Sequence, residues 1–333
     1  MHKLKKVIYI HLGYPKTATK TLQAHFFPYL KNVDYLGKLG KFEEYKITKI
    51  KKKILLDLYH GKVNEILNYR KKFSHSLYND IENSSALISA EGLVMNSLRF
   101  IQDTTYNCKK LTSIYEVIDA IKALFDHNLF DIKLILVTRR QIELIPSLYA
   151  QDYKYSHSNI KLIDTFQKYF NHIVSDESSP ISNYLDYYEL VRIIEKEFSA
   201  DNILILPFEQ FVENKISFLN NLARFMSTSF EDNVLKSTSI ENKSDEKYKK
   251  RKYYRYTFDE ILTIKKKQYY SLNFFSPSKY LFALLEFIIQ YTKNPGDVRL
   301  TDKQKNTLFE KYKKSNQLLS QKYKLNLDNY KYF

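Results

Sequence analysis

Two short segments of the sequence combine residue types that bind anions. The first, residues 13–21, reads Gly-Tyr-Pro-Lys-Thr-Ala-Thr-Lys-Thr and lies between an apolar run and a periodic segment that begins at Leu22. A glycine at a strand end, followed by hydroxyl side chains and two lysines, suits the binding of a phosphate-like group by backbone N–H groups where a helix starts. The chain has only six glycines, so this glycine favours a functional turn over an ordinary connection with surface lysines.

The second segment places two adjacent arginines, Arg139 and Arg140, directly after the apolar run 133–138. Ser147 follows eight residues beyond Arg139, and only nine of the 53 basic residues are arginine. A guanidinium fork pairs with two phosphate oxygens at once, which a lysine does not do. An arginine at this strand end therefore suits the binding of an anionic group. The alternative is that Arg139 pairs with a carboxylate and Ser147 only packs.

The first segment departs from the P-loop of nucleoside triphosphatases, in which a glycine and a lysine are adjacent and precede Ser or Thr. Counted from Gly13, Ala18 takes the place of that glycine and Thr19 the place of that lysine. Lys20 falls one residue late, and Lys16 lies inside the loop instead. A small-molecule kinase therefore stays an alternative that this spacing opposes.

Residues 15–21 resemble the 5′-phosphosulfate loop of sulfotransferases that use 3′-phosphoadenosine 5′-phosphosulfate (PAPS), which commonly reads Pro-Lys-Thr-Gly-Thr-Thr. The resemblance implies that Lys16 neutralises the bridging oxygen as the S–O bond breaks. In this sequence Ala18 replaces the usual glycine and Lys20 a usual threonine or serine, departures that bear on the geometry of the loop. The residues to which the resemblance assigns the 5′-phosphate are Thr17, Ala18, Thr19, Lys20 and Thr21.

The arginine segment is similar to the 3′-phosphate motif of the same family, in which an arginine at a strand end and a serine on the next helix bind that phosphate. The similarity covers residues 139–141 and 147–151, a pattern common in bacterial members. The two motifs also follow each other in the order of the family. The resemblance implies that Arg139 and Ser147 select the 3′-phosphate of PAPS, which argues against ATP as the donor.

Two further sites resemble the family less specifically. Glu91 follows the apolar run 86–89, and the resemblance implies a base that takes the proton of the acceptor hydroxyl; the alternative is that it orients Lys16 or the acceptor. The segment 242–251 resembles the loop that closes over the nucleotide.

That second resemblance implies nucleotide contacts from Lys250 and Arg251, with a solvated run of charges as the alternative. His11, next to the first segment, is predicted to be a packed strand-end residue and not a catalyst.

Four short apolar runs predict the buried strands that must position these residues. The strands are expected at 6–12, 86–89, 133–138 and 202–206, and helical spacing occurs at 41–80, 114–128, 141–155, 186–198 and 215–227. This alternation predicts an α/β fold with a P-loop-like parallel sheet flanked by helices and a ligand at the carboxyl ends of the strands.

The sequence changes character after residue 236. Residues 237–270 are rich in Lys, Tyr, Arg and Ser, and helical patterns return beyond them. We predict an α/β nucleotide-binding core over 1–236, and a mobile covering loop with a helical C-terminal cap over 237–333, within one domain.

Composition sets wider limits on structure and partners. The chain of 333 residues is 44% hydrophobic, enough for a sizeable core. Its one cysteine, Cys108, excludes an internal disulfide, and no metal is expected because the histidines lack ligand spacing. The net charge of +16 predicts attraction to anions without choosing among them. A basic protein that binds nucleic acid or another anionic polymer stays an alternative, although nucleic acid is not the expected partner.

Neither candidate apolar stretch predicts export or membrane insertion. The run 7–12 is too short for a secretory signal, and the run 280–291 carries Glu286 and is too short for a membrane span. We predict a buried helix over 280–291 and a cytosolic protein, with peripheral contact to a membrane left open. Resemblance to bacterial carbohydrate sulfotransferases implies a glycan or another hydroxyl compound as acceptor and 3′,5′-ADP as product.

Overall fold

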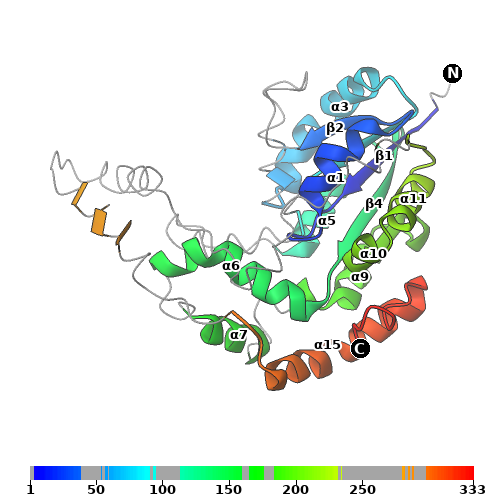
Figure 1. Cartoon of the computed structure of the whole chain (residues 1–333). Helices are drawn as coiled ribbons and strands as arrows, with labels where there is room; N and C mark the ends of the chain where they lie inside the picture. Colours follow the sequence, from blue (N-terminus) through cyan, green and yellow to red (C-terminus); the bar gives the residue numbers. More distant parts are fainter. Residues whose placement is uncertain are drawn as a thin grey trace.

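The computed structural model describes residues 4–38, 60–90, 113–159, 165–175, 184–231 and 298–333, with isolated positions between them. Five strands form one parallel sheet in the order β2-β3-β1-β4-β5 (Figure 1). They are β1 (Lys6–His11), β2 (Asp34–Lys38), β3 (Ser85–Ser89), β4 (Phe130–Thr138) and β5 (Ile203–Pro207). The prediction of a P-loop-like parallel sheet flanked by helices, with a helical C-terminal cap, is confirmed.

The helices of the described ranges follow the strands in alternation. They are α1 (Thr19–His25), α3 (Val63–Asp80), α5 (Ile114–Leu124), α6 (Gln141–Asn159), α7 (Phe166–Ser175), α9 (Tyr187–Glu195), α10 (Phe208–Glu213), α11 (Lys215–Phe225) and α15 (Asp302–Tyr323), with short 3₁₀ turns η1 (Phe27–Tyr29) and η3 (Ala200–Asn202). Each of the four predicted strands coincides with an observed one. The sequence reading missed β2, α7 and α10.

The two faces of the sheet carry separate apolar cores. Along β1, Ile8 and Ile10 belong to one core and Tyr9 to the other, as the alternation of a strand requires. Helices α3, α5, α6, α9 and α15 contribute buried residues to the first core, while α1, α10 and α11 contribute to the second. The C-terminal helix α15 packs against α6 and α9, below the sheet in Figure 1.

One prediction of burial is wrong. The described positions of the run 280–291 are helical, but their side chains are 45–56% exposed at Tyr280, Leu281, Leu284, Leu285 and Ile288. Spacing of i, i+3, i+4 and i+7 predicts a helix face, but it does not say what covers that face. Within the described ranges, no helix is long and apolar enough to cross a membrane.

The topology brings the predicted anion segments to one edge of the sheet. The central strand β1 is hydrogen-bonded to β3 on one side and to β4 on the other. After β1 the chain passes through α1 to β2, so the next two strands, β2 and β3, lie on one side of β1 in the sheet. The later strands, β4 and β5, lie on the other side of β1, and α6 follows β4. In open parallel sheets, ligands bind beyond the carboxyl ends of the strands where the direction of winding changes. That point lies between the segments that follow β1 and β4.

Candidate active site

The segment that follows β1 is a tight loop with an unusual backbone. Gly13, Lys16 and Ala18 have left-handed conformations, with φ of 58°, 64° and 58°. A left-handed conformation costs a non-glycine residue roughly 1–2 kcal/mol, and such strain concentrates where a structure serves a function. Left-handed positions within a loop also turn backbone N–H groups toward a concavity that binds anions. Ala18 thus adopts a conformation that glycine reaches without steric cost.

The threonines of this loop close it upon itself. The Thr17 hydroxyl donates to the Tyr14 carbonyl oxygen at 2.6 Å, and the Thr19 hydroxyl donates to the same oxygen at 3.2 Å. Thr17, Thr19 and Thr21 are buried, whereas Lys20 is exposed. Since two hydroxyl hydrogens are directed to Tyr14, the loop offers an anion its backbone N–H groups and its lysines.

Tyr14 anchors the loop to the rest of the fold. Its fully buried hydroxyl donates to the Tyr184 carbonyl oxygen at 2.5 Å, and its ring makes an edge contact with Tyr187 at a centroid distance of 5.5 Å. Burial raises the pKa of the Tyr14 hydroxyl well above its usual value, so this group stays a donor. The loop is therefore anchored to Tyr184 and to Tyr187, the first residue of α9.

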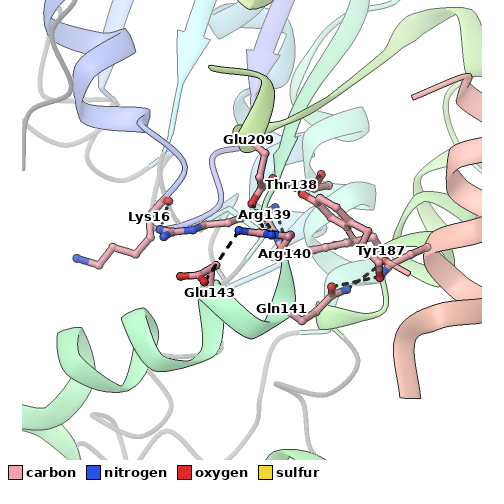
Figure 2. Close-up of polar contacts among 10 residues, drawn as sticks. Lys16, Thr138, Arg139, Arg140, Gln141, Glu143, Tyr187 and Glu209 are labelled. Atoms are coloured by element: carbon pink, nitrogen blue, oxygen red, sulfur yellow. Dashed lines mark hydrogen bonds and ion pairs between the residues drawn. The ribbon is translucent and has the colours of Figure 1, made fainter. Parts of the chain in front are cut away.

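Arg139 joins the two predicted anion segments. Because His11 of β1 pairs with Ile135 of β4, the residues beyond each strand emerge side by side. Arg139 Nη1 donates to the Lys16 carbonyl oxygen at 2.8 Å, and in Figure 2 the Lys16 ammonium points away from this contact. The guanidinium also lies over the Phe208 ring, 4.9 Å from its centroid.

The Arg139 side chain keeps binding capacity within this arrangement. Burial lowers the pKa of Arg139, an effect that the carboxylates of Glu209 and Glu143 oppose, and the group stays charged at neutral pH. Its Nε is buried and has no hydrogen-bond partner among the described residues. A buried guanidinium N–H without a partner is unfavourable, and an anion beside the loop would satisfy it.

Arg140 forms ion pairs with two carboxylates, although its Nε, like that of Arg139, has no hydrogen-bond partner among the described residues. Its backbone N–H donates to Glu209 Oε1 at 3.0 Å, and its Nε lies 3.7 Å from the same oxygen. Its Nη2 lies 4.0 Å from Glu143 Oε1 (Figure 2). The carboxylate pairing that the sequence left as an alternative for Arg139 therefore occurs at Arg140.

Three residues that brace the arginine turn were not among the predicted site residues. The Tyr187 hydroxyl donates to the Arg139 carbonyl oxygen at 2.5 Å. Glu209, the second residue of α10, which follows β5 directly, also accepts from the Tyr332 hydroxyl at 2.7 Å. Glu209 could have been proposed because it is an acidic residue shortly after a predicted strand. No neighbouring residues in the sequence indicate a comparable role for Tyr187 or Tyr332.

Four predicted site residues remain: Ser147, Glu91, Lys250 and Arg251. Ser147 is partly buried in α6, six residues beyond the first residue of the helix, Gln141. Glu91, Lys250 and Arg251 lie outside the described residues.

His11 is fully buried at the end of β1, as expected for a packed strand-end residue. Its Nδ1 lies 2.8 Å from the Ser89 hydroxyl, which also accepts from the Gln23 amide at 2.8 Å, and its Nε2 has no partner within the described chain. Burial lowers the pKa of His11 to about 4, so the imidazole is neutral near pH 7.

No cluster of three or more His, Cys, Asp or Glu side chains in the described ranges could hold a metal ion. The arrangement therefore brings three features to one edge of the sheet. They are a loop with left-handed backbone positions, the side chain of Lys16 and the partly buried guanidinium of Arg139. Such a set of groups can bind a molecule with two separate anionic groups.

No family model and no curated protein match the sequence. Among solved structures, a sulfotransferase from Alicyclobacillus acidocaldarius aligns with 91% of this chain and 100% of its own, at 10% identity and a TM-score of 0.40. The sulfotransferase domain of the Synechococcus PCC 7002 olefin synthase aligns over 94% and 95% of the two chains, at 13% identity and a TM-score of 0.37. The sulfotransferase domain of the curacin biosynthetic pathway aligns over 71% and 79%, at 13% identity and a TM-score of 0.30. At these values the alignments do not establish a family.

Proposed function

We propose that this chain is a sulfotransferase that moves a sulfuryl group from PAPS to a hydroxyl and releases 3′,5′-ADP. The observation that carries the proposal is the hydrogen bond from Arg139 Nη1 to the Lys16 carbonyl oxygen. It joins two segments, 123 residues apart in sequence, that separately suit a 5′-phosphosulfate and a 3′-phosphate. A donor with two phosphorus-bearing groups needs two such sites at a fixed separation, whereas ATP needs only the first.

The residues divide the work of an in-line transfer. The acceptor oxygen forms a bond to sulfur while the bond from sulfur to the 5′-phosphate oxygen breaks, and the leaving nucleotide keeps the electron pair. Lys16 stabilises the charge that develops on that oxygen, and the loop from Thr17 through Ala18, Thr19 and Lys20 to Thr21 holds the 5′-phosphate. Arg139 and Ser147 hold the 3′-phosphate.

The acceptor side of the proposal rests on the sequence. We assign the proton of the acceptor hydroxyl to Glu91, and a covering contact with the nucleotide to Lys250 and Arg251. A glycan is the proposed acceptor, the cytosol the proposed location, and no metal takes part. Replacement of Glu91 by Gln keeps the shape and removes the basicity, so turnover should fall by roughly 10²- to 10⁴-fold while the affinity for 3′,5′-ADP survives.

Incubation with labelled PAPS and a panel of glycans, lipids and small hydroxyl compounds, with mass-resolved detection of products, tests the reaction. Calorimetric titration with 3′,5′-ADP, 5′-AMP and ATP with Mg²⁺ tests the site independently of the acceptor. We expect a clear preference for 3′,5′-ADP over 5′-AMP. Equal affinities would remove the 3′-phosphate assignment, and binding of ATP with Mg²⁺ but not of 3′,5′-ADP would favour a kinase.

A further inference from the structure

We infer that Glu209 and Tyr332 are positioning residues for the Arg139–Arg140 turn, so that the C-terminal end of the chain sets the preference for a 3′-phosphorylated nucleotide. This inference rests on the proposed function and adds two residues to it. Neither residue is expected to touch the nucleotide. They act through the backbone of the turn that carries Arg139.

Glu209 holds the turn from the side of β5. Its side chain is 10% exposed, and both of its oxygens accept hydrogen bonds, Oε1 from the Arg140 N–H at 3.0 Å and Oε2 from the Tyr332 hydroxyl at 2.7 Å. A buried carboxylate is costly unless it is paired and hydrogen-bonded, and here both conditions are met. The strand β5 is the neighbour of β4 in the sheet. Glu209 therefore connects α10, the helix that follows β5, to the turn at the end of β4.

Tyr332 completes this connection from the end of the chain. Its buried hydroxyl donates to Glu209 and lies 3.4 Å from the Thr138 hydroxyl, on the last residue of β4. Its carbonyl oxygen accepts from the Asn316 amide at 3.0 Å, and Asn316 also exchanges hydrogen bonds at 3.2 Å with the Gln141 amide. The residues on both sides of the two arginines, Thr138 and Gln141, are therefore linked to the C-terminal segment.

The Tyr332 hydroxyl is a permanent donor in this place. Burial raises its pKa well above the usual value for tyrosine, and the nearby Glu209 carboxylate raises it further. The Tyr332 hydroxyl thus stays protonated and donates to Glu209. With the Tyr187 hydroxyl on the Arg139 carbonyl oxygen, the backbone of the turn is held on two sides. The direction of the Arg139 side chain toward Lys16 depends on that backbone.

The test is Tyr332→Phe, with Tyr323→Phe as the matched control. The Tyr323 hydroxyl also donates to a glutamate, Glu195 Oε1 at 2.8 Å, but this pair joins α15 to α9 and has no contact with the arginine turn. Both variants lose one tyrosine–carboxylate hydrogen bond, so their melting temperatures should fall together. The ratio of the affinities for 3′,5′-ADP and 5′-AMP should fall by about tenfold in Tyr332→Phe only, because a hydrogen bond to a charged group contributes about 1.5 kcal/mol.

A second pair of variants separates position from charge. Glu209→Ala removes the acceptor of the Arg140 N–H and should lower the same ratio by at least about tenfold. Glu209→Gln keeps a side-chain oxygen for that N–H and should retain most of the preference. Should Glu209→Ala fail to fold, the tyrosine pair still decides the matter.

The outcomes distinguish this inference from the proposed function. A wild-type preference that survives unchanged in Tyr332→Phe overturns the inference and leaves the proposed function in place. Absence of any wild-type preference for 3′,5′-ADP overturns both. An equal loss in Tyr332→Phe and Tyr323→Phe would assign the effect to stability and also overturn the inference.

Discussion

The two segments proposed to bind anions are held in place by different means. The loop after β1 closes through hydrogen bonds from Thr17 and Thr19 to Tyr14, three and five residues away, and through left-handed backbone positions. The turn after β4 is held by Tyr187 and Glu209, which lie 48 and 69 residues further along the chain. The first segment thus closes largely through local contacts, and long-range contacts of Tyr14 and Lys16 anchor it to the rest of the fold. The conformation of the second depends on the assembled fold.

The largest expected effect concerns the lysine of the local segment. Replacement of Lys16 by Ala should lower sulfuryl transfer by roughly 10²- to 10³-fold, because its charge is needed most as the leaving phosphate oxygen becomes negative. The affinity for 3′,5′-ADP should change much less, since ground-state binding uses this charge only in part. Turnover with labelled PAPS and calorimetric titration measure the two effects.

Lys72, an exposed residue of α3, provides the control, and its replacement by Ala should leave both quantities unchanged. Wild-type turnover by the Lys16 variant would contradict the role assigned to this lysine.

A second prediction tests the buried support of the same loop. The folded chain keeps His11 neutral, with a pKa of about 4, whereas the unfolded chain binds a proton below about 6.5. Between these values only the unfolded state takes up the proton, so stability is complete above pH 6.5 and decreases as the pH falls toward 4. One pKa unit corresponds to about 1.4 kcal/mol, so this residue should lower the free energy of unfolding by about 3 kcal/mol over that range.

Denaturant unfolding at several pH values measures this dependence. In His11→Gln the slope of stability against pH should become shallower, whereas His75→Gln, at an exposed position of α3, should keep the wild-type slope. Identical slopes in the wild type and in His11→Gln would show that the imidazole does not resist protonation.

A third prediction separates the two adjacent arginines of the non-local segment. Arg139→Ala should reduce the affinity for 3′,5′-ADP by about 10- to 100-fold, because charge-assisted hydrogen bonds contribute about 1.5–3 kcal/mol. Arg140→Ala should cost less, since its guanidinium already faces Glu143 and Glu209 and its backbone N–H remains in place. Calorimetric titration with 3′,5′-ADP and 5′-AMP compares the two variants. Equal losses of affinity in the two variants would contradict the prediction that Arg139, which contacts the Lys16 loop, binds the nucleotide more strongly than Arg140 does.

Much of the local structure could be predicted from the sequence. The four continuous apolar runs coincide with β1, β3, β4 and β5, because strands buried on both faces leave this pattern. The strand β2 escaped notice since its sequence, Asp-Tyr-Leu-Gly-Lys, has no continuous apolar run. It also contains Gly37 with a φ of 76° and pairs irregularly with β3. Helix α7 did carry a readable signal: its buried residues, Phe166, Tyr169, Phe170 and Ile173, recur at i, i+3, i+4 and i+7.

The bracing of the arginine turn could not be predicted in the same way. Glu209 contacts Arg140 because β5 lies next to β4 in the sheet. The order of strands in a sheet cannot be predicted from a local sequence pattern. Tyr332 reaches Glu209 from 123 residues away, through the packing of α15 on α6 and α9. Type and spacing were therefore enough to propose which residues bind anions, whereas the residues that hold them in place required the fold.

The smallest expected effect tests whether the first segment is governed by its own backbone. Ala18 has a φ of 58° and a ψ of 15°, a conformation that glycine adopts without the steric cost that a Cβ imposes. Ala18→Gly should therefore stabilise the folded protein by about 0.5–1 kcal/mol, the relief of strain being partly offset by the greater freedom of glycine in the unfolded chain. Ala123→Gly, in the last turn of α5, should destabilise it, since glycine is less favourable than alanine in a helix. Denaturant unfolding of the two variants gives the sign directly, and a loss of stability in both would mean that the fold, and not the local backbone, imposes the conformation of the loop.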